Sequence, residues 1–128
     1  MGLNCAIRQK DDVTILDLSG LLTLGDHEGT GVETGVLLRD KVRELAEAGQ
    51  KKILLNLAAI RFVDSSGAGQ LVGAFTSART RGAELKLLSP TSQVKTLLKI
   101  TKLDSLLDIL DDEEMAIQAF GKRAAAAG

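Results

Sequence analysis

The stretch 53-ILLNLAAIRFVDSSGAGQL-71 says most about the fold of this chain. Residues 53–57 are apolar except for Asn56, and a short run that is apolar on nearly both faces is typical of a central strand covered by helices. A second apolar segment at 60–63 leads directly into Asp64-Ser65-Ser66-Gly67. Small polar residues at the end of such a segment predict the point where the chain turns into a helix.

Helical spacing begins after this turn. Apolar residues recur at positions 68, 71, 72, 75 and 78, so we expect a helix that starts near Ser66 and ends at Gly82. The strand before the turn and the helix after it predict one step of a layered α/β domain.

The N-terminal part of the chain predicts a hairpin followed by a long loop. Residues 3–10 and 13–19 read as two strands, and the two-residue turn Asp11-Asp12 makes an antiparallel pair the natural arrangement. The stretch 22–35 is rich in glycine and predicts a loop, and helical periodicity starts at about Val36.

The C-terminal part predicts two more strands and two more helices. Residues 84–88 form a short apolar strand, after which Ser89 is expected to be the N-cap of a helix with Pro90 at its first position. Residues 106–110 predict a last short strand. The acidic run 111–114 then predicts a helix N-terminus, where the dipole favours negative charge.

Together these elements predict an α/β fold with a mixed, mostly parallel β-sheet, an N-terminal antiparallel hairpin and about four α-helices. We expect one domain over residues 1–121 and a frayed C-terminal tail over residues 122–128.

Composition argues against several classes of function. The net charge is −1 and the aromatic residues are three Phe, so neither a basic surface nor stacking side chains predict nucleic-acid binding. No apolar run approaches the ~20 residues of a transmembrane helix, and we expect no membrane insertion. Cys5 is the single cysteine and cannot form an intramolecular disulfide, which fits a cytoplasmic protein.

The turn Asp64-Ser65-Ser66-Gly67 has two interpretations. It is an ordinary N-cap, since Asp and Ser are preferred caps and glycine lets the chain turn. It is also a place where a phosphate on Ser65 is tolerated, because a helix N-terminus stabilises negative charge. A phosphate adds about −1.5 to −2 charges at pH 7 and would repel a partner that docks on the neutral form.

These residues resemble the STAS domain of anti-sigma factor antagonists. The resemblance rests on Val63-Asp64-Ser65-Ser66-Gly67-Ala68-Gly69 after an apolar strand, with the run 53–57 before it and a helix, a strand and Ser89-Pro90 after it. It extends over nearly the whole chain, from Leu18-Ser19-Gly20 to the 106–120 region. The resemblance implies the STAS fold.

The resemblance also implies a regulatory switch. In that family an ATP-dependent anti-sigma factor serine kinase phosphorylates the first serine of the motif, which is Ser65 here. The unphosphorylated antagonist binds the kinase and frees the sigma factor, and a PP2C-type phosphatase removes the phosphate. Asp64, Ser66 and Gly67 would then belong to the partner-binding surface.

One departure from the family pattern lies before the first helix. Members usually carry Gly-x-Leu-Asp after the second strand, whereas this chain has Gly20-Leu21-Leu22-Thr23 followed by several inserted residues. The corresponding loop of the family contacts the partner, which places Thr23 and Asp26 in the expected partner-binding surface. Asp26 would replace the missing acid.

Other functions remain alternatives. A STAS interaction subunit of a stressosome-like scaffold or of a transport complex would use the same fold without a sigma-factor circuit. A hydrolase built from Ser65, His27 and Asp26 is disfavoured, because the Gly-x-Ser-x-Gly pattern is absent. A single His and a distant single Cys predict no metal site, and no complete dinucleotide fingerprint is found, so we expect no cofactor and no enzyme. Both a monomer and a weak dimer are compatible with the sequence.

Overall fold

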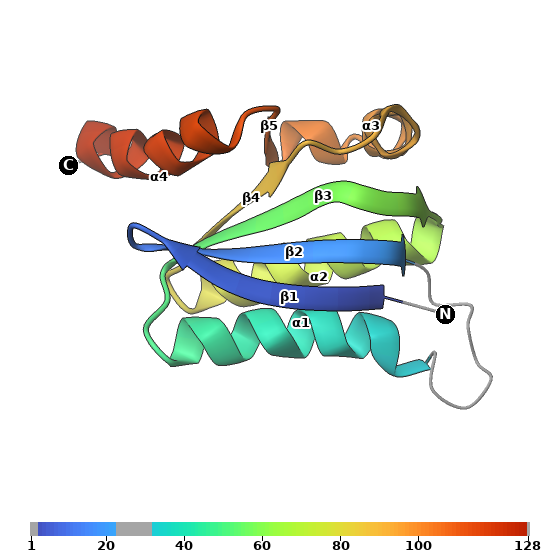
Figure 1. Ribbon diagram of the computed structural model, residues 1–128, viewed down its shortest axis with the longest axis horizontal. Coiled ribbons are helices and arrows are strands. Elements are labelled where there is room, and N and C mark those ends of the chain that lie inside the picture. The colour runs from blue at the N-terminus through green and yellow to red at the C-terminus, as the bar shows by residue number, and fades with distance from the viewer. Residues whose placement is uncertain (1–2, 23–31, 128) are drawn as a thin grey trace.

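The computed structural model of the chain describes residues 3–22 and 32–127 (Figure 1). The elements are β1 (Leu3–Lys10), β2 (Val13–Leu22), α1 (Val32–Glu47), β3 (Lys52–Val63), α2 (Ser65–Thr80), β4 (Glu84–Leu88), α3 (Ser92–Ile100), the 3-10 helix η1 (Leu103–Ser105), β5 (Asp108–Leu110) and α4 (Glu113–Ala127).

The strands form one five-stranded sheet in the order β1-β2-β3-β4-β5. β1 and β2 pair antiparallel, and all later neighbours pair parallel. This confirms the predicted mixed sheet with its N-terminal hairpin. The parallel pairs are possible because α1, α2 and α3 provide the long connections that parallel strands need.

The helices cover the sheet on two sides. In Figure 1, α1 and α2 lie along one face and α4 lies on the other. The larger apolar cluster joins α1, α2 and α3 to the middle strands, and it includes Leu16, Leu55 and Leu71, all without solvent exposure. A smaller cluster on the opposite face packs Phe120 of α4 against Ile15 and Leu54. Burial on both faces explains why residues 53–57 are almost continuously apolar.

Several boundaries differ from those predicted. β2 continues to Leu22, and β3 is a single strand to Val63 instead of two apolar segments. Helix α1 begins at Val32, earlier than the expected Val36. Its first residues therefore belong to the stretch 22–35 predicted as a loop, whose residues 23–31 lie outside the described part of the chain.

The predicted start of helix α3 at Ser89-Pro90 was wrong. The helix begins at Ser92, and the N-cap is Thr91, whose hydroxyl accepts a hydrogen bond from the Val94 N–H at 3.4 Å. Ser89 instead donates its N–H to the Leu110 carbonyl at 2.7 Å and adopts a positive φ of 52°. The positive φ is not the extended backbone of an N-cap, and the Ser89 hydroxyl donates to the Asp111 carbonyl at 3.2 Å, so Ser89 does not cap the helix.

At the C-terminus, β5 covers only Asp108–Leu110, because the N–H groups of Leu106 and Leu107 bond back to the Leu103 carbonyl at 3.0 and 2.8 Å instead of continuing the strand. Helix α4 continues to Ala127, into the stretch 122–128, where fraying stays a prediction. No helix within the described ranges is long and apolar enough to cross a membrane.

Candidate functional site

The predicted site lies where strands β2 and β3 end side by side. β4 pairs with β3 only over residues 52–56, whereas β2 follows β3 to its end, so that Leu22 lies opposite Val63. Irregularities in the β2–β3 register after Asp17 and after Gly20 add residues to β3 along this part of the sheet. The long β3 thus carries the turn Asp64–Gly67 past the end of β4.

Asp64 is the N-cap of helix α2. Its backbone is extended, with φ −101° and ψ −174°, and its Oδ1 accepts a hydrogen bond from the Gly67 N–H at 2.8 Å. The Asp64 carbonyl accepts the first helical bond from the Ala68 N–H at 2.9 Å. A carboxylate in this position also interacts favourably with the positive end of the helix dipole.

Ser65 and Ser66 are the first two residues of the helix. An α-helix leaves the N–H groups of its first turn without acceptors inside the helix, and the Asp64 cap takes up the one that belongs to Gly67. The N–H groups of Ser65 and Ser66 therefore lie at the positive end of α2. Ser66 is exposed to solvent. This turn has the electrostatic features of an anion-binding helix start.

Gly67 is required for packing. It is buried, and a Cβ atom at this position would overlap the Leu22 carbonyl oxygen and come within 3.1 Å of the Val63 Cγ1. The absence of a side chain lets the start of α2 rest directly on the end of β2. Burial gives Gly67 a supporting role under the turn, and its direct contact with a partner stays a prediction.

The residues predicted for the site are partly brought together. Asp64, Ser65, Ser66 and Gly67 form one turn at the start of α2. Thr23 and Asp26 lie outside the described residues.

Sequence reasoning missed Phe62 as a surface residue, because it stands in an apolar run before the motif. In the structure Phe62 is 48% exposed, whereas Ile60 and Val63 are buried. The neighbouring Arg61 is also exposed. The exposure pattern changes after Leu57, where β3 has lost its β4 neighbour and every third residue is buried. The sequence did not show that β4 is too short to pair with the second half of β3, so the exposure of Phe62 was not predicted.

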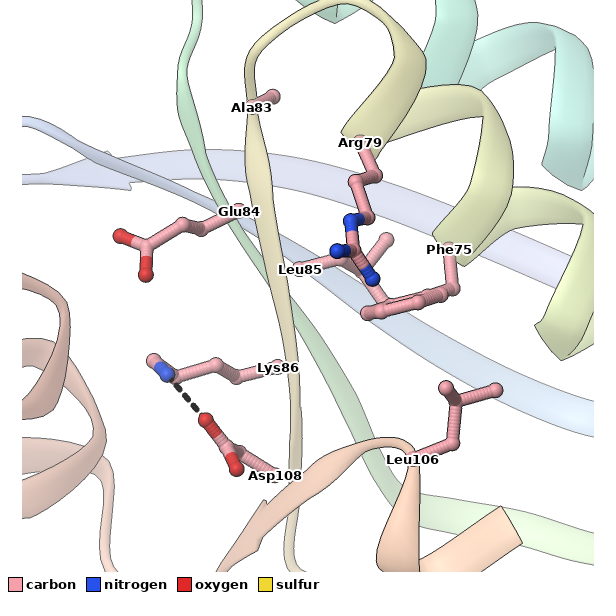
Figure 2. Close-up of a pocket in the computed structure, with 8 residues that line it drawn as sticks. All are labelled: Phe75, Arg79, Ala83, Glu84, Leu85, Lys86, Leu106 and Asp108. Atoms are coloured by element: carbon pink, nitrogen blue, oxygen red, sulfur yellow. Dashed lines mark hydrogen bonds and ion pairs between the residues drawn. The ribbon is translucent and has the colours of Figure 1, made fainter. Parts of the chain in front are cut away.

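A second cleft lies beside the C-terminal half of α2. Figure 2 shows Arg79 and Phe75 on one side of β4 and the ion pair of Lys86 with Asp108 on the other. The Lys86 Nζ lies 2.6 Å from the Asp108 carboxylate and 5.2 Å from the centre of the Phe120 ring. The described residues that line the cleft include no serine, cysteine or histidine. Within the described ranges, no group of three or more His, Cys, Asp or Glu side chains is placed to hold a metal ion.

Comparison with known proteins gives a consistent result. The profile of the STAS domain matches residues 4–116. The anti-sigma-B factor antagonist of Bacillus subtilis (strain 168) is 27% identical over 118 residues, which cover 92% of this chain and all of the relative. The crystal structure of TM1081 from Thermotoga maritima has a TM-score of 0.76 at 27% identity, and the match covers 90% of this chain and 92% of TM1081.

Two structures of SpoIIAA have the same fold. The unphosphorylated form has a TM-score of 0.72 at 21% identity, covering 93% of this chain and 97% of SpoIIAA. The phosphorylated form of the Bacillus protein has a TM-score of 0.65 at 19% identity, covering 91% of this chain and 99% of SpoIIAA. Because the family profile extends from β1 into α4 and the sheet has the same architecture, this chain belongs to the STAS domain family.

Proposed function

We propose that this protein is an anti-sigma factor antagonist that is switched by phosphorylation of Ser65. Its unphosphorylated form binds an anti-sigma factor serine kinase, which releases a sigma factor and so regulates transcription. The observation that carries the proposal is the position of Ser65 as the first residue of α2, directly after a cap supplied by Asp64. Since Asp64 caps the helix, the helix does not rely on Ser65 for its start.

The geometry supports a switch that leaves the fold in place. A phosphate on Ser65 would add about −1.5 to −2 charges beside the Asp64 carboxylate at pH 7. The helix dipole and the N–H groups of the first turn favour negative charge there, which offsets the repulsion within the domain. A partner that fits the neutral turn would meet the full repulsion and desolvation cost. Phosphorylation would therefore weaken the complex more than it destabilises the antagonist.

The proposed partner surface surrounds this turn. It contains Asp64, Ser66 and Gly67, together with Thr23 and Asp26 from the segment after β2. Phe62 adds an exposed apolar side chain beside the turn, and large aromatic residues often contribute strongly to binding at protein interfaces. A PP2C-type phosphatase would remove the phosphate at the same place and reset the switch.

A kinase assay tests the proposal. We expect incubation with ATP and the cognate anti-sigma factor kinase to add one phosphate, which mass spectrometry locates at Ser65. The Ser65→Ala variant should remain unmodified, whereas Ser66→Ala should still be modified at Ser65. Phosphorylation should lower the affinity for the kinase by at least about tenfold, or about 1.4 kcal/mol, measured by calorimetry.

The same assay discriminates the alternative function. If every anti-sigma factor kinase of the source organism leaves Ser65 unmodified, the switch is contradicted. A STAS scaffold or transport subunit would then be favoured, in agreement with the unusual Gly20-Leu21-Leu22-Thr23 sequence and the insertion after it.

A further inference from the structure

The outer strand β1 exposes a long edge of the sheet. It is the first strand in the order of the sheet, so among the described residues no strand lies beyond it. All its residues from Asn4 to Lys10 are exposed, and Ile7 is 45% exposed. An edge strand of eight residues with unpaired main-chain groups is a template for pairing with another strand.

The register of the hairpin identifies the main-chain groups at this edge. Lys10 and Val13 close a two-residue turn, and such a closing pair exchanges both of its hydrogen bonds. Alternate residues of β1 therefore bond to β2, and the residues between them direct their N–H and C=O groups away from it. The outward groups belong to Leu3, Cys5, Ile7 and Gln9.

The charges beside this edge are neutralised within the domain. Charged side chains on edge strands usually prevent unwanted pairing. Here Arg8 forms ion pairs with Asp17 at 2.6 Å and with Glu113 at 2.7 Å, and Lys10 lies 3.5 Å from Glu114. The two cations of β1 are thus compensated by carboxylates of their own chain. The edge presents apolar side chains at Cys5 and Ile7 without a net repelling charge.

We propose that two copies of this chain pair antiparallel through β1 and form a continuous ten-stranded sheet. We propose the register whose two-fold axis lies at Ala6. Ile7 of each copy then lies opposite Cys5 of the other, and their outward main-chain groups meet. Arg8 lies opposite Asn4 of the second copy. An axis at Arg8 would instead place two guanidinium groups directly opposite each other, which is unfavourable.

A second copy suits this edge because the edge is self-complementary. A two-fold interface uses the same patch on both subunits, and apolar Cys5 and Ile7 match each other under the proposed axis. Strand pairing at the edge alone involves less surface than a standard stable interface, so the dimer should be weak and dependent on concentration. It leaves the Ser65 turn open, since that turn follows β3, two strands away in the sheet.

Sedimentation velocity over a concentration series tests the dimer. We expect a reversible monomer–dimer equilibrium for this chain. Ile7→Pro removes an outward N–H without breaking a bond to β2, and symmetry removes it twice, so the dissociation constant should rise at least about tenfold. Ile7→Lys should have the same effect, because lysine on an edge strand opposes pairing. The matched control is Ile100→Lys, which changes an isoleucine of α3 that is 70% exposed and should leave the equilibrium unchanged.

Cross-linking locates the interface. Cys5 is the only cysteine, so any thiol cross-link between copies joins the two Cys5 residues. Under the proposed axis they are diagonal neighbours, with Cα atoms about 7–8 Å apart, within reach of a short bismaleimide. We expect a cross-linked dimer in the native chain and its loss in Ile7→Pro. Thermal melts check that Ile7→Pro and Ile7→Lys are folded. A chain that is monomeric at all soluble concentrations, or a dimer unaffected by both Ile7 variants, would overturn the proposal.

Discussion

At the scale of single residues, Gly67 is needed both for the turn and for the packing of α2 against β2. In the sequence it is a small residue that allows a turn. In the structure its Cα faces the Leu22 carbonyl oxygen so closely that a side chain does not fit. For Gly69, two residues later, no described atom outside its chain neighbours and its own helix backbone lies within 4 Å of a Cβ built on it. A side chain is therefore excluded at Gly67 but can be accommodated at Gly69.

Alanine at each position should have opposite effects. Gly67→Ala forces backbone atoms apart, and we expect a loss of roughly 2 kcal/mol or more in the free energy of unfolding, as for other overpacked sites. Gly69→Ala should stabilise the protein by about 0.5–1 kcal/mol, because alanine loses less backbone entropy in a helix. Urea denaturation of both variants measures this. Equal effects at the two positions would contradict the packing assigned to Gly67.

At the scale of elements, the start of α2 combines a cap with the proposed switch. The Asp64 side chain supplies the cap through its bond to the Gly67 N–H. No acidic side chain follows in the first turn of this helix. The helix N-terminus thus has one carboxylate and can stabilise a further negative charge, which is the electrostatic basis of the proposed phosphorylation at Ser65.

Substitutions of Asp64 should separate the contribution of its hydrogen bond from that of its negative charge. Asp64→Ala removes the acceptor and should lower the free energy of unfolding by about 1 kcal/mol. Asp64→Asn keeps an oxygen acceptor of similar shape and should retain most of that stability. Thermal and urea unfolding of the pair measures the cap without any kinase. If asparagine is as destabilising as alanine, then the carboxylate charge and not the hydrogen bond stabilises the helix start.

At the scale of the whole molecule, Arg8 connects the N-terminal hairpin to the last helix. It bonds Asp17 of β2 and Glu113 of α4, although Glu113 lies 105 residues away in sequence. The hydrogen bonds from Arg8 are the main reason why the pKa values of the Asp17 and Glu113 carboxyls are lowered. A single guanidinium thus links the first and last elements of the fold.

This link should make stability depend on pH. Because both carboxyl pKa values are lower in the folded state, the unfolded chain binds protons first as the pH falls. The contribution is complete above the ordinary values of 3.8 and 4.5 and is lost as the pH falls through the lower native values. Urea midpoints of the native chain and Arg8→Gln should therefore differ at pH 7 and converge as the pH falls below 3.8.

The size of this difference should be modest, since both carboxylates are partly exposed and surface ion pairs contribute about 0–1 kcal/mol each. Arg61→Gln is the matched control, because Arg61 is exposed and no ion pair is found for it among the described residues. A constant difference between the native chain and Arg8→Gln from pH 7 to pH 2 would rule out this origin of the pH dependence.

The sequence alone determined the order of the elements and the location of the candidate turn. The hairpin of β1 and β2 and the strand at Glu84–Leu88 follow from apolar alternation and turn residues. The helix after Asp64 follows from cap residues and helical spacing. These signals are local, because periodicity and capping depend on residues within a few positions of each other.

Only the tertiary structure decided how the turn is supported and what surrounds it. The need for glycine at position 67 comes from β2, and the exposure of Phe62 comes from the end of β4. Ser89 adopts a positive φ and its hydroxyl bonds to the Asp111 carbonyl, so the helix begins at Ser92 with Thr91 as its cap, against the local Ser-Pro signal. Each of these outcomes depends on contacts between segments far apart in the chain. Local pattern therefore predicted the elements, whereas packing between them determined which side chains support the site and which face solvent.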